Sequence, residues 1–224
     1  MTPTLSKVTD FFGYQSNALR LISSRAGYAR QVQETAGICV INARDLSGDF
    51  LNPVCQYVVA ANLTLSFVLG KAYTHNGLGF MLTSVSVHSA VCSFPVVTLT
   101  GTANEGANAI KTHAVSVNIK ARSKAQDVAG AFGYGYSGCH LNECETTWSA
   151  EHVVIVQPVE LSGGTKIAKP VASDIQHGRV EVTAKTVLGA PTVANGWDLI
   201  VTPDPNGADV NYEIHTATAT KSLT

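Results

Sequence analysis

This sequence has few charged residues for a soluble protein. Asp, Glu, Lys and Arg together make up 14% of its 224 residues, whereas soluble domains average roughly 25%. A surface made mostly of Ser, Thr, Asn, Ala and Gly carries few charges that would oppose association with other chains. This scarcity is typical of a subunit that buries much of its surface in an assembly, and also of a secreted adhesin-like domain.

The sequence also lacks a long apolar run. The longest apolar zone, residues 54–69, is interrupted by Gln56, Asn62, Thr64 and Ser66, so it falls short of the roughly 20 apolar residues of a membrane helix. Residues 1–7 contain no apolar core of a signal peptide. We therefore expect a protein without membrane contact, made in a cytosol, whose five cysteines stay reduced.

The common catalytic motifs are missing too. The chain has no phosphate-binding GxxxxGK[ST], no GxGxxG after a predicted strand, no HExxH, no GxSxG and no EF-hand loop. Its seven histidines are scattered over predicted strands and turns, and nothing in the spacing places one beside a nucleophile. We therefore predict a protein that is not an enzyme and uses no cofactor.

One cluster carries the residue types of a zinc site, in which thiolates and imidazoles are the usual ligands. Cys139 and Cys144 are separated by four residues, and His152 follows eight residues later. His140 directly follows Cys139 and is expected to point away from it. The spacing leaves three interpretations open: free thiols, a disulfide formed in an oxidising medium, or a metal site. Free thiols fit the spacing best, so we predict no metal, with Cys139, Cys144 and His152 as the candidates to test.

What the sequence has in abundance is alternation of apolar with small or hydroxylated residues, the period of half-buried strands. Val115, Val117 and Ile119 share one face of such a run, while Ser116 and Asn118 share the other. Gly, Asn and Pro punctuate the runs. The predicted strands are Cys39–Ala43, Tyr57–Leu69, Gly79–Ala90, Val96–Gly101, His113–Ala121, His152–Leu161, Arg179–Val187, Asp198–Thr202 and Tyr212–Lys221.

About nine short strands predict an all-β fold, a β-sandwich or barrel-like arrangement of two sheets. One or two short helices are expected beside it, at Ser16–Ile22 and Lys120–Phe132. Long alternating strands with small polar outer faces favour pairing between copies, which would complete exposed strand edges.

The organisation changes near residues 130–149, where glycines alternate with aromatic residues. Residues 1–124 carry ten Lys or Arg and five Asp or Glu, and residues 125–224 carry five and eleven, which gives formal charges of +5 and −6. We interpret residues 1–224 as one assembly unit, loosely divided at 130–149 into a basic lobe (1–129) and an acidic lobe (150–224). Opposite charge on the two lobes favours head-to-tail or ring assembly.

Five segments together resemble the tail tube proteins (major tail proteins) of tailed bacteriophages. They are Phe80–His88, Phe94–Gly106, His113–Lys120, Lys124–Gln126 and the C-terminal run from Gly196 to Leu223. The resemblance covers roughly residues 78–224. It implies a two-sheet β-sandwich with a flanking helix, in rings commonly of six subunits that stack into a DNA conduit, and it carries over no catalytic residue. The implied location is the tail of the virion, after synthesis in the host cytoplasm, with self and other tail proteins as partners.

The residue pattern itself supports that interpretation in one respect, because a lumen lined by small polar groups lets DNA slide without specific binding. Two alternatives stay open. One is another virion role, in a capsid decoration or a baseplate. The other is a carbohydrate- or protein-binding β-sandwich, in which Tyr134, Tyr136 and Trp148 would form the platform.

Overall fold

The fold is all-β, and a computed structural model defines it. The structure describes residues 12, 14, 17–25, 32–35, 38–41, 54–75, 78–90, 93–103, 109–121, 134–135, 140–160, 162–164, 166–187, 192–193, 196–203 and 214–223. This part of the chain contains no helix, and therefore none that is long and apolar enough to cross a membrane. The strands are β1 (Leu19–Arg25), β2 (Val32–Thr35), β3 (Ile38–Ile41), β4 (Val54–Val59), β5 (Leu63–Leu69), β6 (Ala72–His75), β7 (Leu78–Ala90), β8 (Val96–Ala103), β9 (His113–Ile119), β10 (Tyr134–Gly135), β11 (His140–Glu160), β12 (Lys166–Val187), β13 (Thr192–Val193), β14 (Asp198–Pro203) and β15 (Ile214–Ser222).

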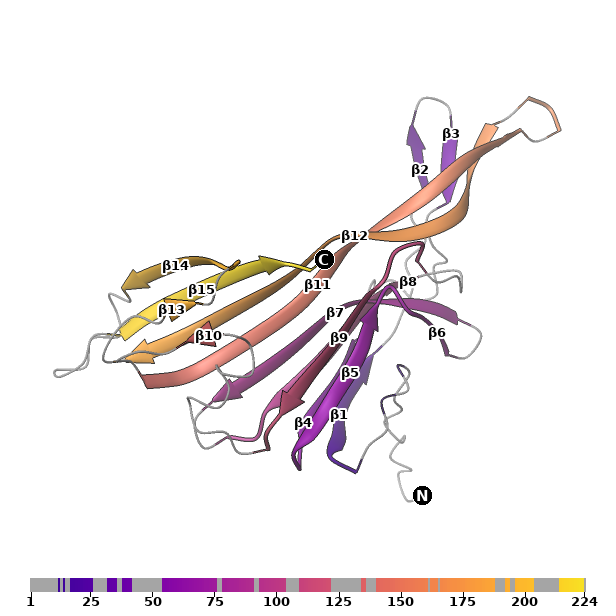
Figure 1. Cartoon of the computed structure of the whole chain (residues 1–224). Helices are drawn as coiled ribbons and strands as arrows, with labels where there is room; N and C mark the ends of the chain where they lie inside the picture. The colour runs from indigo at the N-terminus through magenta and orange to yellow at the C-terminus, as the bar shows by residue number, and fades with distance from the viewer. Residues whose placement is uncertain are drawn as a thin grey trace, which may run out of the picture.

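One large sheet dominates the molecule (Figure 1). Its main path runs β1-β4-β8-β7-β11-β12-β15-β14, and each neighbouring pair on this path is antiparallel. Off the path, β6 pairs with β7, and the β2–β3 hairpin joins β12 through a short parallel contact. Strands β10 and β13 form a separate two-stranded sheet.

A second layer, the antiparallel pair β5–β9, packs over the large sheet. Leu65 and Phe67 of β5, and Val117 and Ile119 of β9, are buried in the same core as the apolar residues of β4, β7 and β8. The Phe67 ring meets the Trp148 ring of β11 edge to face, with 5.5 Å between ring centres. Burying side chains of this size contributes about 1.5–3 kcal/mol each, so the alternating strands are held by one shared interior.

The expected all-β, two-layer architecture is therefore confirmed, and period-two alternation explains it. In β4 every second residue is buried, as in most of β5. The run expected as one strand, Tyr57–Leu69, is two strands, because the chain turns at Ala60–Asn62 and β5 leaves the large sheet for the second layer.

The helix expected at Ser16–Ile22 is wrong. Leu19–Arg25 forms β1 and pairs with β4. Leu19 and Leu21 pack against the core while Arg20 is exposed, so the apolar spacing of two decided the conformation. Of the other expected helix, Lys120–Phe132, residues 122–132 lie outside the described part of the chain, and Lys120 follows the end of β9 without helical structure.

The described second half of the stretch 130–149, residues 140–149, is regular strand. Residues 140–149 form the first half of β11, which pairs with β7 on one side and with β12 on the other. Strand β7 comes from the basic half of the sequence and β11 from the acidic half, so both halves share one sheet. The glycine-rich residues 130–139 lie outside the described part of the chain except for Tyr134–Gly135, whereas the paired residues 143–149 have ordinary strand alternation.

Beyond the body of the sheet, β11 and β12 continue as a two-stranded arm, here defined as Glu151–Glu160 and Lys166–Gln176 (Figure 1). The arm begins at a β-bulge, where β12 has one residue more than β11 between the pairs Ser149↔Arg179 and Glu151↔Gln176. His177, in this bulge, has φ 51°, and a Cβ on the neighbouring Gly178 would lie 2.7 Å from Nε2 of His113. The bulge therefore redirects the hairpin out of the sheet.

Candidate assembly surfaces

One face of the large sheet packs on the core, and the opposite face, the hydroxyl face, presents small polar side chains. The pairing register places its members in rows that cross all eight strands of the main path. One row connects Ser23, Gln56, Thr98, Ser86, Thr147, Glu181, Thr220 and Asp198, from β1 to β14. Neighbouring rows add Ser84, Thr100, Ser149, Thr183, Thr216, Thr218 and Thr202.

Side-chain hydrogen bonds order this face at its β1 end. Ser23 Oγ donates to Gln56 Oε1 over 2.9 Å, and Gln56 Nε2 donates to Thr98 Oγ1 over 3.4 Å. The residues of the row are half-buried on the inner strands and exposed on the two outermost ones. The face is thus broad and mostly polar, with its hydroxyl groups interspersed by the aliphatic side chains of Val54, Val58, Val96 and Ile200.

Charges on the hydroxyl face are few and mostly paired. Glu143 Oε1 lies 2.7 Å from His88 Nε2, and Glu143 Oε2 lies 3.2 Å from Lys185 Nζ. The hydrogen bonds from His88 and then Lys185 hold the pKa of Glu143 below its ordinary value. Arg179 pairs with Glu181 at 3.6 Å. A polyanion approaching this face meets no unbroken basic patch among the described residues.

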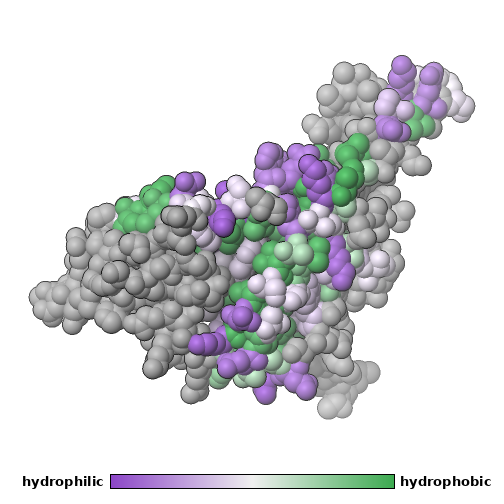
Figure 2. All heavy atoms as spheres, viewed as in Figure 1, coloured by the Kyte–Doolittle hydropathy of each residue, from purple (hydrophilic) through white to green (hydrophobic). Residues whose placement is uncertain are grey.

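The large sheet ends at two edge strands, β1 and β14. Each exposes a large aliphatic side chain: Ile22 is 50% exposed and Ile200 is 69% exposed. Figure 2 shows hydrophobic surface over β14, at the free end of the sheet. Natural proteins usually protect such edges with charges, prolines or bulges. β1 has a bulge at Ile22, but β14 pairs with β15 without irregularity and carries one charge, Asp198.

The arm is a third candidate surface. Ile155 and Val159 of β11 are 38% and 36% exposed, and alternation places them on the same side of the strand. Beyond Ile175, no described residue of the arm belongs to either buried core cluster. Apart from a short contact of β12 with β3 at Ile167 and Ala168, the arm is a two-stranded ribbon. Such a ribbon without a core of its own is marginally stable alone, so the arm gains from contact with another surface.

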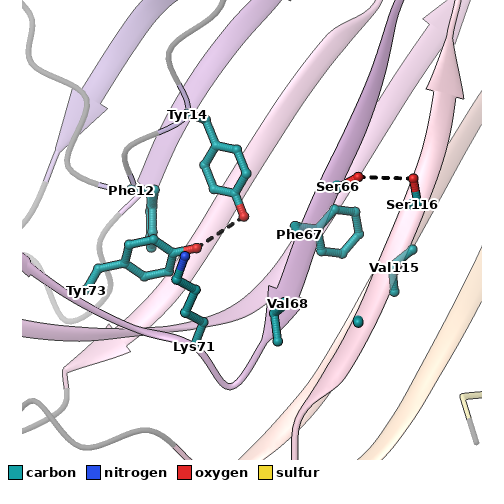
Figure 3. A pocket seen from close by; sticks show the side chains of 10 residues that line it. Phe12, Tyr14, Ser66, Phe67, Val68, Lys71, Tyr73, Val115 and Ser116 are labelled. Atoms are coloured by element: carbon teal, nitrogen blue, oxygen red, sulfur yellow. Dashed lines mark hydrogen bonds between the residues drawn. The ribbon is translucent and has the colours of Figure 1, made fainter.

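A groove of about 370 Å³ lies between the second layer and the start of the chain (Figure 3). Phe12, Tyr14 and Tyr73 line one side of it, and β5 and β9 line the other. The Tyr14 and Tyr73 hydroxyl oxygens lie 3.1 Å apart, and Lys71 Nζ lies 5.1 Å from the centre of the Tyr73 ring. Aromatic faces beside a cation form a surface suited to a flat, partly polar ligand.

The predicted metal candidates do not converge. Cys144 and His152 lie on the same strand, β11, eight residues apart, which at the rise of a strand is roughly 26 Å. They cannot bind one ion. Cys139 lies outside the described residues, and within the described ones no group of three possible ligands comes together.

Cys144 and His152, the two described candidates, each lie in an environment of their own. Cys144 is a free, buried thiol, and burial raises its pKa to about 12. His152 is half-buried, its Nε2 has no hydrogen-bond partner in the described part of the chain, and burial lowers its pKa. Of the three interpretations, the free thiol describes Cys144.

The predicted aromatic platform does not form around Trp148. Its side chain is 5% exposed and packs against Phe67 in the core. Tyr136 lies outside the described residues, as does the side chain of Tyr134. Half-buried aromatic side chains instead line the groove at Tyr14 and Tyr73. Sequence reasoning missed this pair because the two tyrosines are 59 residues apart.

Comparison with protein-family models, with curated proteins and with solved structures found no match to this chain.

Proposed function

We propose that the protein is a structural virion component, a bacteriophage tail tube subunit whose copies form stacked rings around a DNA conduit. The observation that supports this most is the large sheet itself, which has a hydroxyl face on one side and, among the described strands, an edge strand without a further partner at either end. Exposed edges invite pairing with another chain. When the partners are identical copies related by a rotation that divides a full turn evenly, that pairing closes into a ring.

The hydroxyl face suits the wall of a conduit. DNA binding draws most of its affinity from Lys and Arg neutralising phosphates. On this face Arg179 and Lys185 are each paired with a glutamate. The exposed Arg20 adds one positive charge, and Glu145 and Asp198 add two negative charges, none of them with an ion-pair partner among the described residues. Small hydroxyl groups with a slight acidic excess leave a duplex free to slide, so DNA passes without specific binding.

The arm suits the contact between successive rings. It extends away from the sheet (Figure 1) and presents Ile155 and Val159 to whatever lies beyond the body. A neighbouring ring of the same protein covers these side chains, and at the ends of the tube other tail proteins take its place. The proposed location is accordingly the virion tail, after synthesis in the host cytoplasm.

Negative-stain microscopy and sedimentation velocity of the purified protein at rising concentration test the proposal. The expected result is rings that stack into tubes. Introducing Ile155→Lys together with Val159→Lys should leave rings but abolish tubes. Glu160→Lys, which changes the charge equally on the opposite side of the strand, serves as the control. Particles without tube geometry favour a decoration or baseplate role. A strictly monomeric protein at every concentration excludes assembly altogether.

The groove favours one alternative, a binding β-sandwich for carbohydrates or proteins. Its aromatic rings and the exposed Ser66 and Ser116 hydroxyls are groups that bind sugars. Glycan-array binding by the wild type, lost in Tyr73→Ala and kept in the distant Trp197→Ala, would support this alternative. No glycan binding by a protein that forms tubes would dismiss it.

A further inference from the structure

The two edge strands of the large sheet run in opposite directions. Seven successive antiparallel pairings separate β1 from β14 along the main path, and an odd number of reversals leaves the first and last strands antiparallel. Rotation about a ring axis preserves the direction of every strand along that axis. The β1 strand of the next copy therefore arrives beside β14 already antiparallel to it.

The faces match as well as the directions. On β14 the residues belonging to the hydroxyl face are Asp198, Ile200 and Thr202, and on β1 they include Arg20 and Ser23. A rotated copy keeps this face on the same side of the ring. A joint between β14 and the next β1 thus continues one unbroken hydroxyl face from copy to copy.

The charges of the two edges are opposite. β14 has one charged residue, Asp198, and β1 has two, Arg20 and Arg25. Asp198 and Arg20 are both exposed, and neither has an ion-pair partner among the residues that the structure describes. Joining two β1 strands would gather four arginines, whereas joining β14 to β1 brings an aspartate to the basic edge.

We propose that copies of this chain join head to tail, β14 of one copy pairing antiparallel with β1 of the next, with Asp198 set against an arginine of that β1. The inference rests on the proposed ring assembly and specifies its joint. The row that contains Asp198 ends on β1 at Ser23, and Arg20 and Arg25 occupy the rows on either side. An offset of one row in either direction places Asp198 beside one of the two arginines.

Charge reversal in the full-length protein tests this joint. Asp198→Arg alone should raise the concentration at half-assembly about tenfold, because a basic residue then faces a basic edge. One of Arg20→Asp and Arg25→Asp should do the same, and which one does so identifies the offset. Lys120→Glu, a charge reversal at an exposed position directly after β9 in the second layer, lies outside both edge strands and the arm and should leave the assembly concentration unchanged.

A rescue experiment distinguishes the loss of this specific joint from a general effect of the added charge on assembly. Combining Asp198→Arg with the sensitive arginine reversal in one chain should restore assembly. Mixing the two singly reversed chains should also restore it, in particles that alternate the two chains, which mass tags on one of them would show. All three positions are on edge strands, so each variant is expected to fold. Circular dichroism checks that it does.

The outcomes distinguish this inference from the proposed function. If the wild type assembles but neither arginine reversal is rescued by Asp198→Arg, the head-to-tail joint is wrong and the assembly proposal stands. A joint between two β14 strands would give sensitivity to Asp198→Arg with none at Arg20 or Arg25, and also overturns it. If the wild type never assembles, both fail.

Discussion

Asp174 and Lys111 connect the base of the arm to the second layer. Oδ1 of Asp174 accepts a hydrogen bond of 2.9 Å from the backbone N–H of Lys111 and another of 2.9 Å from the backbone N–H of Ile175. Asp174 is only 6% exposed. The hydrogen bond from Lys111, with smaller help from Ile175, holds the pKa of this carboxyl below its ordinary value despite burial.

This contact predicts a pH dependence of stability. A carboxyl whose pKa is lower in the folded than in the unfolded chain stabilises the fold above the unfolded pKa of about 3.9, and that contribution is lost as the pH falls through the lower, folded value. In Asp174→Asn this part of the acid sensitivity should disappear, and the variant should be less stable than wild type at pH 7. Urea unfolding at a series of pH values measures both. Equal pH slopes for the two proteins would contradict the assignment.

Gly70 is required for two reasons that can be separated. It has φ +87°, and a Cβ there would lie 2.9 Å from Ile175 Cδ1 and 3.0 Å from the Lys111 carbonyl oxygen. Gly70→Ala should cost about 2–4 kcal/mol, from backbone strain and overpacking together. Gly164 has φ +80°, but a Cβ at this position would have no heavy atom within 4 Å, so Gly164→Ala should cost only about 1 kcal/mol. Urea unfolding compares them, and equal losses would refute the contribution of packing.

His177 occupies the left-handed region in the bulge where the arm begins. A side chain in that region costs roughly 1–2 kcal/mol. Replacing it with glycine removes this strain, but the larger conformational entropy of glycine in the unfolded chain offsets part of the gain. His177→Gly should therefore stabilise the protein by up to about 1 kcal/mol. Glu151→Gly, across the bulge on β11, lacks this benefit and should destabilise. A loss of thermal stability in His177→Gly would show that the imidazole has a stabilising role.

Burial and a raised pKa predict that Cys144 is inert in the folded protein. With a pKa of about 12, only about one thiol in ten thousand is ionised at pH 8, and the thiolate is the reactive form. Iodoacetamide at pH 8 should leave Cys144 unmodified under native conditions and alkylate it in urea. Peptide mass spectrometry identifies the site, with Cys144→Ser as the control. Rapid native alkylation would mean that β11 opens locally.

The sequence predicted the strands well wherever one side of the strand is buried and the other side faces solvent. β8, β9 and the second half of β7 alternate cleanly, since Val85 and Val87, for example, point into the core while Ser84 and Ser86 do not. It failed at Leu19–Arg25, where a spacing of three between Leu19 and Ile22 imitated a helix. Ile22 is the extra residue of a bulge, so its position reflects an irregularity that periodicity does not reveal.

The candidate surfaces were harder to predict because they depend on register. Asp198 and Ser23 occupy one row only through seven intermediate pairings, and no local pattern contains that information. Cys144 and His152 were considered together because they are close in sequence, but an extended strand separates such residues by its full rise. Opposite formal charge in the two halves was visible, and the sheet places basic β1 and acidic β14 at opposite ends.

The bulges within the large sheet have a consequence for particle size. β1 has one extra residue at Ile22, and β7 has one at Thr83 against β8, and each such insertion sharpens local twist and bend. In a closed ring the bends of all copies must add up to one full revolution. If copies form the proposed ring, deleting Ile22 or Thr83 should therefore alter how many copies complete the circle while leaving their ability to join intact, and these irregular positions would then set the diameter of the proposed conduit.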